Sequence, residues 1–233
     1  MRDKQWMFPT ESALCRLKMP AGVIFLALCS LCASHATVVV DNTSDTASQV
    51  NAVGSQNGSV YADAAPFMSG TGNLDLVQVA LLLDCSYVSL PGPENFKLQL
   101  WTDNSGLPGS LLTTFTGPSD HNSGIPNTHP GPVTFSTNYL LSSNTPYWLV
   151  ASAPGNSSDK QFDWSATGDS TQTDASGWSI ESNLADQANG GSWTYEPYGA
   201  QLQFSITAAP EPNLFAYLFT GLACMNGFRR LRK

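Results

Sequence analysis

Alternation of apolar and polar residues over short segments dominates the middle of the chain. In residues 96–102, FKLQLWT, the side chains of Phe96, Leu98 and Leu100 fall on one side of an extended backbone, with polar side chains between them. Residues 201–207 repeat this alternation near the end of the chain. The pattern predicts strands that bury one face and expose the other.

Nine segments rich in Val, Thr, Tyr, Phe and Trp are separated by clusters of Gly, Pro, Asn, Asp and Ser, without a sustained 3.6-residue period. They are Thr37–Asp41, Leu74–Leu83, Phe96–Thr102, Leu111–Phe115, Pro132–Phe135, Tyr147–Ala151, Gln161–Trp164, Ser192–Tyr195 and Gln201–Thr207. We therefore predict an all-β fold, an antiparallel β-sandwich over residues 37–209. A jelly-roll-like topology is favoured because the Cys-Trp-Cys pattern of the immunoglobulin core is absent.

The front of the chain has the order of parts of a secretory leader. Arg16 and Lys18 precede an apolar run at residues 23–32, VIFLALCSLC, which is too short to span a bilayer. Ser34-His35-Ala36 follows with small residues at its first and third positions, as at a signal-peptidase site. We predict that residues 1–36 are a signal peptide with an extended n-region, cleaved after Ala36. The alternative is a buried core helix.

Neighbouring residues bear on the start and the type of this leader. A start at Met19 would discard both cations, so a start at or before Met7 is favoured. A lipoprotein is disfavoured because Cys29 and Cys32 each follow Leu rather than a small residue.

The back of the chain joins a proline-rich segment, an apolar run and a basic end. Pro210-Glu211-Pro212 keeps the backbone extended, outside helix and sheet, and accessible. The apolar run Leu214–Phe228 can enter a membrane as a short helix, and the positive-inside rule would retain the basic end on the cytoplasmic side. The basic residues are Arg229, Arg230, Arg232 and Lys233.

This tripartite end resembles the PEP-CTERM sorting signal of bacteria, including Gly221-Leu222 within its apolar run. The resemblance implies that an exosortase processes residues 210–233, with transient membrane contact through a C-terminal hydrophobic helix. It also implies a Gram-negative source and display at the cell surface or in the exopolysaccharide matrix. The alternative is that residues 214–228 form the last helix of the domain.

Charge separates the two ends from the body. The chain has a net charge of −8, and eight of its ten basic residues lie in the two predicted signals. The span Thr37–Ala209 has two cations, Lys97 and Lys160, against 15 acidic residues, which gives a net charge of −13. Such a body repels phosphates and anionic lipid, so a nucleic-acid-binding function is excluded.

The body also resembles the extracellular domain family called choice-of-anchor R. The resemblance rests on the order of several motifs. These are Phe67-x-Ser69-Gly70, Leu100-Trp101-Thr102-Asp103, Gly106-Leu107-Pro108-Gly109-Ser110, Thr134-Phe135 and Tyr147-Trp148-Leu149-Val150. It implies a secreted β-rich body joined to an anchoring tail, and it implies no particular chemistry.

The body has few residues in the arrangements that catalytic sites require. Its only histidines, His121 and His129, lie in a Gly/Pro/Asn-rich stretch, and no Gly-x-Ser-x-Gly elbow occurs. We predict a non-enzymatic protein without catalytic residues. A glycan-active hydrolase that uses two carboxyl groups is the weaker alternative, since no acidic pair stands out among the acidic residues.

Metal ligands of the zinc type are missing, and Cys85 is the body's only cysteine, which we predict to be a buried small side chain. Calcium takes carboxylate and carbonyl oxygens from loops. The segment Asp103-Asn104-Ser105-Gly106, and Asp169 with Asp174, are candidate sources of such ligands, or plain turns. The metal question is therefore open, and no other cofactor is predicted.

Aromatic residues late in the chain raise a second functional hypothesis. Trp164, Trp178, Trp193 and Tyr195 lie among Gly, Asn and Asp residues. Aromatic faces pack well on sugar rings, so these residues are candidates for carbohydrate binding, with extracellular polysaccharide as the partner. The competing interpretation is that these side chains fill the core.

Overall fold

The computed structural model describes residues 35–85, 95–120, 122–126, 129–154, 161–169, 171–196 and 200–210, and all regular secondary structure within these ranges is β-strand. The strands are β1 Thr37–Asp41, β2 Gln49–Gln56, β3 Ser59–Met68, β4 Leu74–Asp84, β5 Lys97–Asp103, β6 Pro108–Thr114, β7 Gly131–Leu141, β8 Pro146–Ser152, β9 Gln161–Thr167, β10 Thr173–Asp174, β11 Ser179–Ile180, β12 Leu184–Ala188, β13 Thr194–Glu196, β14 Gln201–Leu202 and β15 Phe204–Pro210. The all-β prediction is confirmed. The predicted signal peptide and the predicted sorting tail, with its C-terminal helix, lie outside the described residues, except for His35 and Ala36 of the first and Pro210 of the second.

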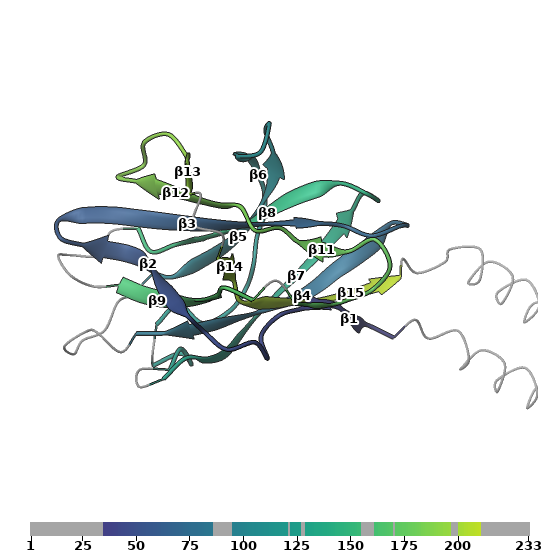
Figure 1. Ribbon diagram of the computed structural model, residues 1–233, viewed down its shortest axis with the longest axis horizontal. Helices are drawn as coiled ribbons and strands as arrows, with labels where there is room; N and C mark the ends of the chain where they lie inside the picture. The colour runs from purple at the N-terminus through teal and green to yellow at the C-terminus, as the bar shows by residue number, and fades with distance from the viewer. Residues whose placement is uncertain are drawn as a thin grey trace, which may run out of the picture. The chain divides into compact units, whose positions relative to one another are not determined.

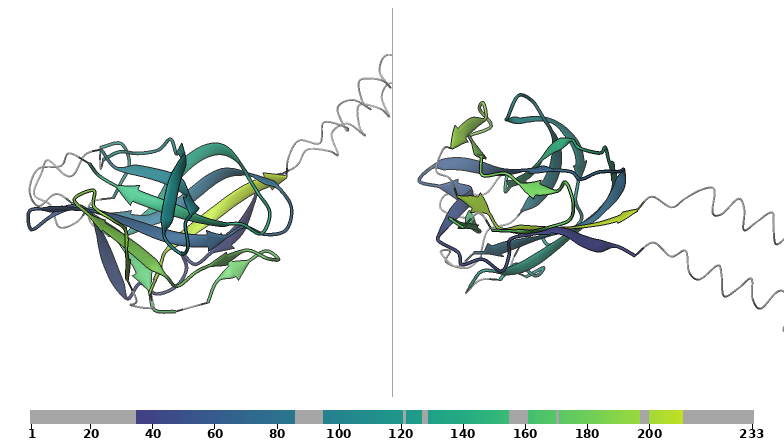
Figure 2. Two further views of the ribbon diagram at one scale, coloured as in Figure 1. Left: turned by 90° about the horizontal axis from the view of Figure 1, so that it is seen from above. Right: turned by 45° about the vertical axis from the view of Figure 1, so that its right-hand side comes forward.

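The strands pair antiparallel throughout, in the order β10-β1-β15-β4-β9-β2-β3-β8-β5-β6. Strand β7 adds to β4, and β11 and β12 add to β3. The connected sheet folds over itself, so that β3, β8 and β11–β13 lie opposite β1, β15 and β9 (Figure 1). Two further views show the same sandwich-like body (Figure 2). The antiparallel and layered parts of the prediction therefore hold.

The core lies between the two layers and is built from alternate positions of their strands. Phe96, Leu98 and Leu100 are buried there, as their alternation predicts. Leu202, Phe204 and Ile206 face the same core from the last strands of the body, each with no exposed surface. Among the described residues, Cys85 is a free cysteine and there is no disulfide. Burial of apolar surface in this core, which contributes about 25 cal/mol per Å2, is therefore the main term that stabilises the body.

Five strands were not predicted, namely β2, β3, β10, β11 and β12. The two longest of them, β2 and β3, consist of residues with weak β-propensity. Strands β2 and β3 contain Gly54, Pro66 and a run of alanines, residues that are depleted in strands. Their connection is nevertheless an Asn-Gly hairpin, with positive φ at Asn57 (49°) and Gly58 (80°), as a type I′ turn requires. Tertiary pairing with β8, β9 and β12 therefore overrides local preference here.

The first and last strands of the body lie side by side. Thr37 of β1 pairs with Ala208 of β15, so the chain enters and leaves the body at one end. Pro210 is the exposed last residue of β15 and pairs with Leu74. The prediction that both prolines lie outside the sheet is therefore wrong for Pro210. A proline is tolerated at the end of a strand because few ladder hydrogen bonds remain to be made there. Within the described ranges, no helix has the length and hydropathy needed to cross a membrane.

Gly70 sits against an indole ring in the turn that follows β3. A Cβ atom at this position would lie 2.3 Å from Cδ1 and Nε1 of Trp178 and 2.9 Å from the carbonyl oxygen of Ser176. Trp178 is buried and stacks on Phe67, with ring centroids 6.2 Å apart, so its ring has little room to move. We expect Gly70→Ala to lower the free energy of unfolding by roughly 1–3 kcal/mol, measured by urea denaturation. Gly168→Ala is the matched control, because neither glycine has a positive φ and a Cβ at Gly168 would lie 3.7 Å from the hydroxyl oxygen of Ser48, an ordinary contact distance.

Candidate functional site

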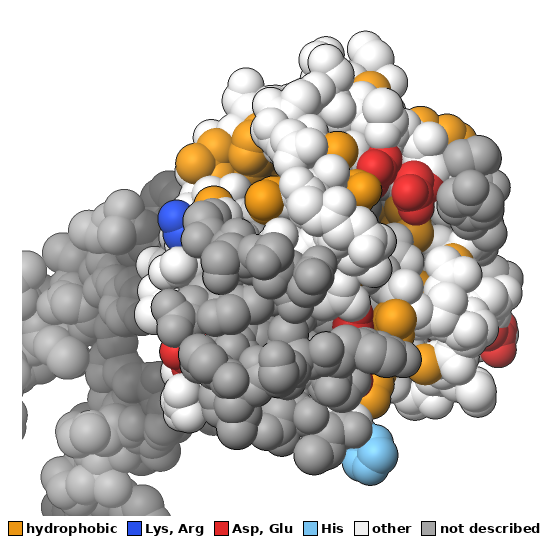
Figure 3. All heavy atoms as spheres, turned by 90° about the vertical axis from the view of Figure 1, so that its left-hand side faces the viewer, with side chains coloured by type: hydrophobic (Ala, Val, Ile, Leu, Met, Phe, Trp, Pro, Cys, Tyr) orange, Lys and Arg blue, Asp and Glu red, His pale blue; other side chains and the backbone are white. Residues whose placement is uncertain are grey.

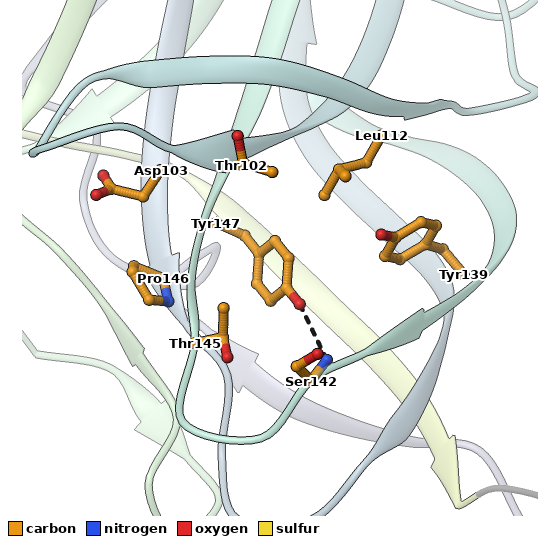
Figure 4. A pocket seen from close by; sticks show the side chains of 8 residues that line it. All are labelled: Thr102, Asp103, Leu112, Tyr139, Ser142, Thr145, Pro146 and Tyr147. Atoms are coloured by element: carbon orange, nitrogen blue, oxygen red, sulfur yellow. Dashed lines mark hydrogen bonds between the residues drawn. The ribbon is translucent and has the colours of Figure 1, made fainter.

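A cleft opens between the edge strands β6 and β7 and has a volume of about 380 Å3 (Figure 4). This volume is at the lower end of the range for small-molecule sites, about 300–1,000 Å3. Its walls come from β5, β6, β7, β8 and the turn between β7 and β8. The lining residues are Thr102, Asp103, Leu112, Tyr139, Ser142, Thr145, Pro146 and Tyr147.

Two tyrosines dominate the cleft. The ring of Tyr147 is buried at its centre, and its hydroxyl oxygen accepts a hydrogen bond from the backbone N–H of Ser142 at 2.9 Å. Tyr139 is half-buried and points into the cleft from β7 (Figure 4). Burial raises the pKa of Tyr139 above its usual value, and the nearby Tyr147 raises it further, so Tyr139 keeps its proton at neutral pH.

The turn below the tyrosines is held by a buried serine. The hydroxyl of Ser69 lies 2.7 Å from the carbonyl oxygen of Ser142 and 3.0 Å from that of Thr145, and it accepts the Thr145 N–H at 2.9 Å. The N–H of Asn144 donates to the carbonyl of Gly70 at 3.0 Å. Through these hydrogen bonds, Ser69 and Gly70, which follow β3, hold the turn that forms one wall of the cleft.

Asp103 joins the cleft to the outer face of the sheet. Its Oδ1 accepts the indole N–H of Trp148 at 2.8 Å, and both carboxylate oxygens lie 3.2 Å from the N–H of Gly106. Asp103 is therefore a turn residue that also orients a tryptophan. Among the described residues, no group of three or more His, Cys, Asp or Glu side chains is arranged to hold a metal ion. Asp169, the other calcium candidate, accepts the N–H of Thr171 at 2.9 Å, as in an Asx turn.

A second aromatic group lies on the outer face of β12, β3, β8 and β5. Small side chains, Ala64 and Ala185, occupy the middle of this face beside Trp148. Across them Trp193 meets Trp101 edge to face, with ring centroids 6.2 Å apart. Tyr195 lies on the same hairpin, is 50% exposed, and donates its hydroxyl hydrogen to Asn183 at 2.8 Å. The hairpins β5–β6 and β12–β13 rise on either side (Figure 1).

The four aromatic residues singled out in the sequence do not form one cluster. Trp193 and Tyr195 lie on the outer face, whereas Trp164 and Trp178 are buried in the main core. Trp164 has no exposed surface, and its indole N–H donates to the carbonyl of Gln203 at 3.0 Å. A ring without an exposed face offers no surface for stacking on a sugar. The tyrosines of the cleft were not predicted as binding residues, because single tyrosines in strand patterns carry no local signal of binding.

Two groups of carboxyl side chains are buried. Asp163 and Asp84 are register partners in β9 and β4, and both are more than nine-tenths buried. Burial, followed by the charge of Asp84, raises the pKa of Asp163 to about 6, and a protonated Asp163 can donate to Asp84. Asp63 pairs with Asp186 across β3 and β12. Burial, then Glu196 and Asp186, raise the pKa of Asp63 well above its usual value.

Positive charge is scarce on the body. Lys97 is the only lysine or arginine among the described residues. Figure 3 shows one face, on which acidic side chains lie beside exposed apolar ones. Cys85 is buried, as predicted, and burial, with the charges of Asp84, Asp163 and Asp120, raises the pKa of its thiol to about 11. It is therefore a poor nucleophile. His129 is exposed, and His121 lies outside the described residues.

No protein-family model matches the chain, and no curated protein matches it significantly.

Proposed function

We propose that the chain is an exported, non-enzymatic surface or matrix protein of a Gram-negative bacterium, sorted through its C-terminal tail by an exosortase. The observation that carries the proposal is the tail itself: Pro210-Glu211-Pro212, the apolar run Leu214–Phe228 and the basic end. Three physically different parts in the order required for membrane entry, retention and processing favour a sorting signal over a last core helix.

The placement of the body's ends supports this proposal. Ala36 and Pro210 are exposed: Ala36 immediately precedes β1, and Pro210 is the last residue of β15. A protease acting after Ala36 would therefore cut at the start of β1, and an exosortase acting at the Pro-Glu-Pro segment would work at the end of β15. The proposal includes the finer fold prediction, a jelly-roll sandwich. The antiparallel pairing and the layered core are consistent with it.

Replacing Pro210-Glu211-Pro212 by three alanines tests the sorting step. In the native host we expect the full-length form to accumulate in membranes and the surface fraction to fall about tenfold or more, measured by immunoblotting of cell fractions. The matched control is Pro130→Ala with Pro132→Ala, two exposed prolines of the body. Unchanged processing and surface location of the triple-alanine variant would refute the proposal.

Carbohydrate binding is a second candidate function, favoured by the exposed tyrosine and the half-buried Trp193 on the outer face and by the tyrosine-lined cleft. Aromatic side chains with one accessible face and a hydrogen-bonding edge are the kind of surface that sugars bind. Calcium assistance stays a proposal. Calorimetric titration of the purified protein with extracellular polysaccharide, with and without calcium, tests both points.

A further inference from the structure

We propose that the cleft between β6 and β7 binds one neutral sugar unit. The inference rests on the second candidate function and assigns it to a site other than the outer-face tryptophans. It needs no assumption about export or sorting. The cleft is the described hollow in which aromatic rings, aliphatic side chains and uncommitted hydroxyl groups converge from four strands (Figure 4).

The apolar surface of the cleft suits the C–H face of a sugar ring. Leu112 reaches in from β6, Pro146 from the start of β8, and the ring of Tyr139 from β7 (Figure 4). Leu112 and Tyr139 are partly buried and pack against the main core, so their positions are set before any ligand arrives. Preformed walls reduce the entropy lost on binding.

The polar groups of the cleft suit the edge of the same ring. The hydroxyl of Tyr147 accepts the N–H of Ser142, so its own hydrogen is available to donate toward the cleft. The hydroxyls of Tyr139 and Ser142 have no hydrogen-bond partner among the described residues and are not fully buried. Each hydroxyl both donates and accepts, which matches sugar hydroxyls in either role.

Charge selects against acidic ligands. None of the residues that line the cleft is a lysine or arginine, and the carboxylate of Asp103 lies at its edge and points away from the two tyrosine rings (Figure 4). A uronate or a phosphorylated sugar would lose hydration on entering without gaining a cationic partner. A neutral sugar has no such cost. The cleft therefore fits neutral units of a polysaccharide rather than acidic ones.

Titration of the purified full chain with a neutral and an acidic oligosaccharide tests the inference. The probes are a β-1,4-linked glucose hexasaccharide, a β-1,4-linked mannose hexasaccharide and an oligogalacturonate, each followed by calorimetry. We expect at least one neutral probe to bind, and we expect Tyr139→Ala to weaken that binding by about tenfold or more, the effect of losing one ring contact and one hydroxyl. Binding of oligogalacturonate alone would overturn the inference.

Two further variants separate this site from the outer face. Tyr139→Phe keeps the ring and the packing, and we expect it to weaken binding less than Tyr139→Ala while leaving the folded state intact. Leu140→Ala, at the exposed neighbour of Tyr139 on the opposite face of β7, is the matched control and should leave binding unchanged. Trp193→Ala tests the outer face. If Trp193→Ala abolishes binding and neither Tyr139 variant affects it, carbohydrate binding stands and the cleft assignment is wrong. If none of the three probes binds, both the cleft assignment and the second candidate function are overturned.

Discussion

Acidification from pH 8 to about pH 5 should stabilise the folded body, the reverse of the usual acid destabilisation of proteins. The carboxyl groups with shifted pKa values among the described residues, Asp63, Asp163 and Glu196, are all shifted upward. For Asp163 the first cause is burial, and the second is the charge of Asp84. Folding therefore costs free energy whenever these groups are ionised.

The sign follows from proton uptake. Asp163 has its ordinary pKa of 3.8 in the unfolded chain and about 6 in the folded body, so the folded state binds more protons between these values. Stability must then fall as the pH rises through this window, and it levels off above pH 6 for this group. The change amounts to about 3 kcal/mol for a group with these two pKa values. The pKa of Asp63 shifts in the same direction, so this carboxyl group adds to the loss.

Asp163→Asn should remove most of this dependence. An amide cannot ionise, and its NH2 group can donate to Asp84 as a protonated Asp163 would. We expect the variant to gain roughly 2 kcal/mol over the parent protein at pH 8 and little at pH 4.5, by urea denaturation at both pH values. Asp174→Asn, an exposed acid in β10, is the matched control. A parent protein more stable at pH 8 than at pH 5 would contradict the argument.

The parts of the fold that depend on local alternation were predictable from the sequence. Strand β5 buries Leu98 and Leu100 and exposes Lys97, as the period of two requires. Strand β7 was predicted as Pro132–Phe135 but continues to Leu141, because its second half pairs with Leu74, Asp75 and Leu76 of β4. That extension depends on a distant partner strand, and it is what carries Tyr139 into the cleft.

Long-range pairing likewise explains why the candidate site was only partly predictable. Tyr147 and Tyr139 are eight positions apart and converge through the turn that Ser69 holds from more than 70 residues away. Two tryptophans show the same limit of local sequence information. Trp178 and Trp193 have similar polar neighbours in the sequence, yet one stacks on Phe67 in the core and the other lies on the outer face. Composition shows that aromatic residues are present but does not show which face they occupy.

The largest loss of stability is expected at a polar residue, Asn42, whose burial the alternation of apolar and polar residues does not predict. Its side chain has no exposed surface and bridges the entry of the body to its last strand. Oδ1 accepts the N–H of Phe204 at 2.8 Å, and Nδ2 donates to the carbonyl of Leu202 at 3.2 Å. The side-chain Nε2 of Gln203 donates to the backbone carbonyl of Asn42 at 3.1 Å. Side chains from both segments therefore stabilise the corner between β1 and β15.

Asn42→Ala should therefore destabilise the body by about 3–4 kcal/mol, because the N–H of Phe204 and the carbonyl of Leu202 lose their partner in the interior, at about 1–3 kcal/mol each. Urea denaturation at pH 6 measures the loss. Asn138→Ala, an exposed asparagine of β7, should change stability by less than about 0.5 kcal/mol. Equal stability of the two variants would mean that the corner is not held by Asn42. In Asn42→Ala, amide hydrogen exchange at Phe204 and Ile206 should also become faster, because the side-chain hydrogen bonds that join β15 to the end of β1 are lost. Strand β15 is the strand that leads into the predicted sorting tail.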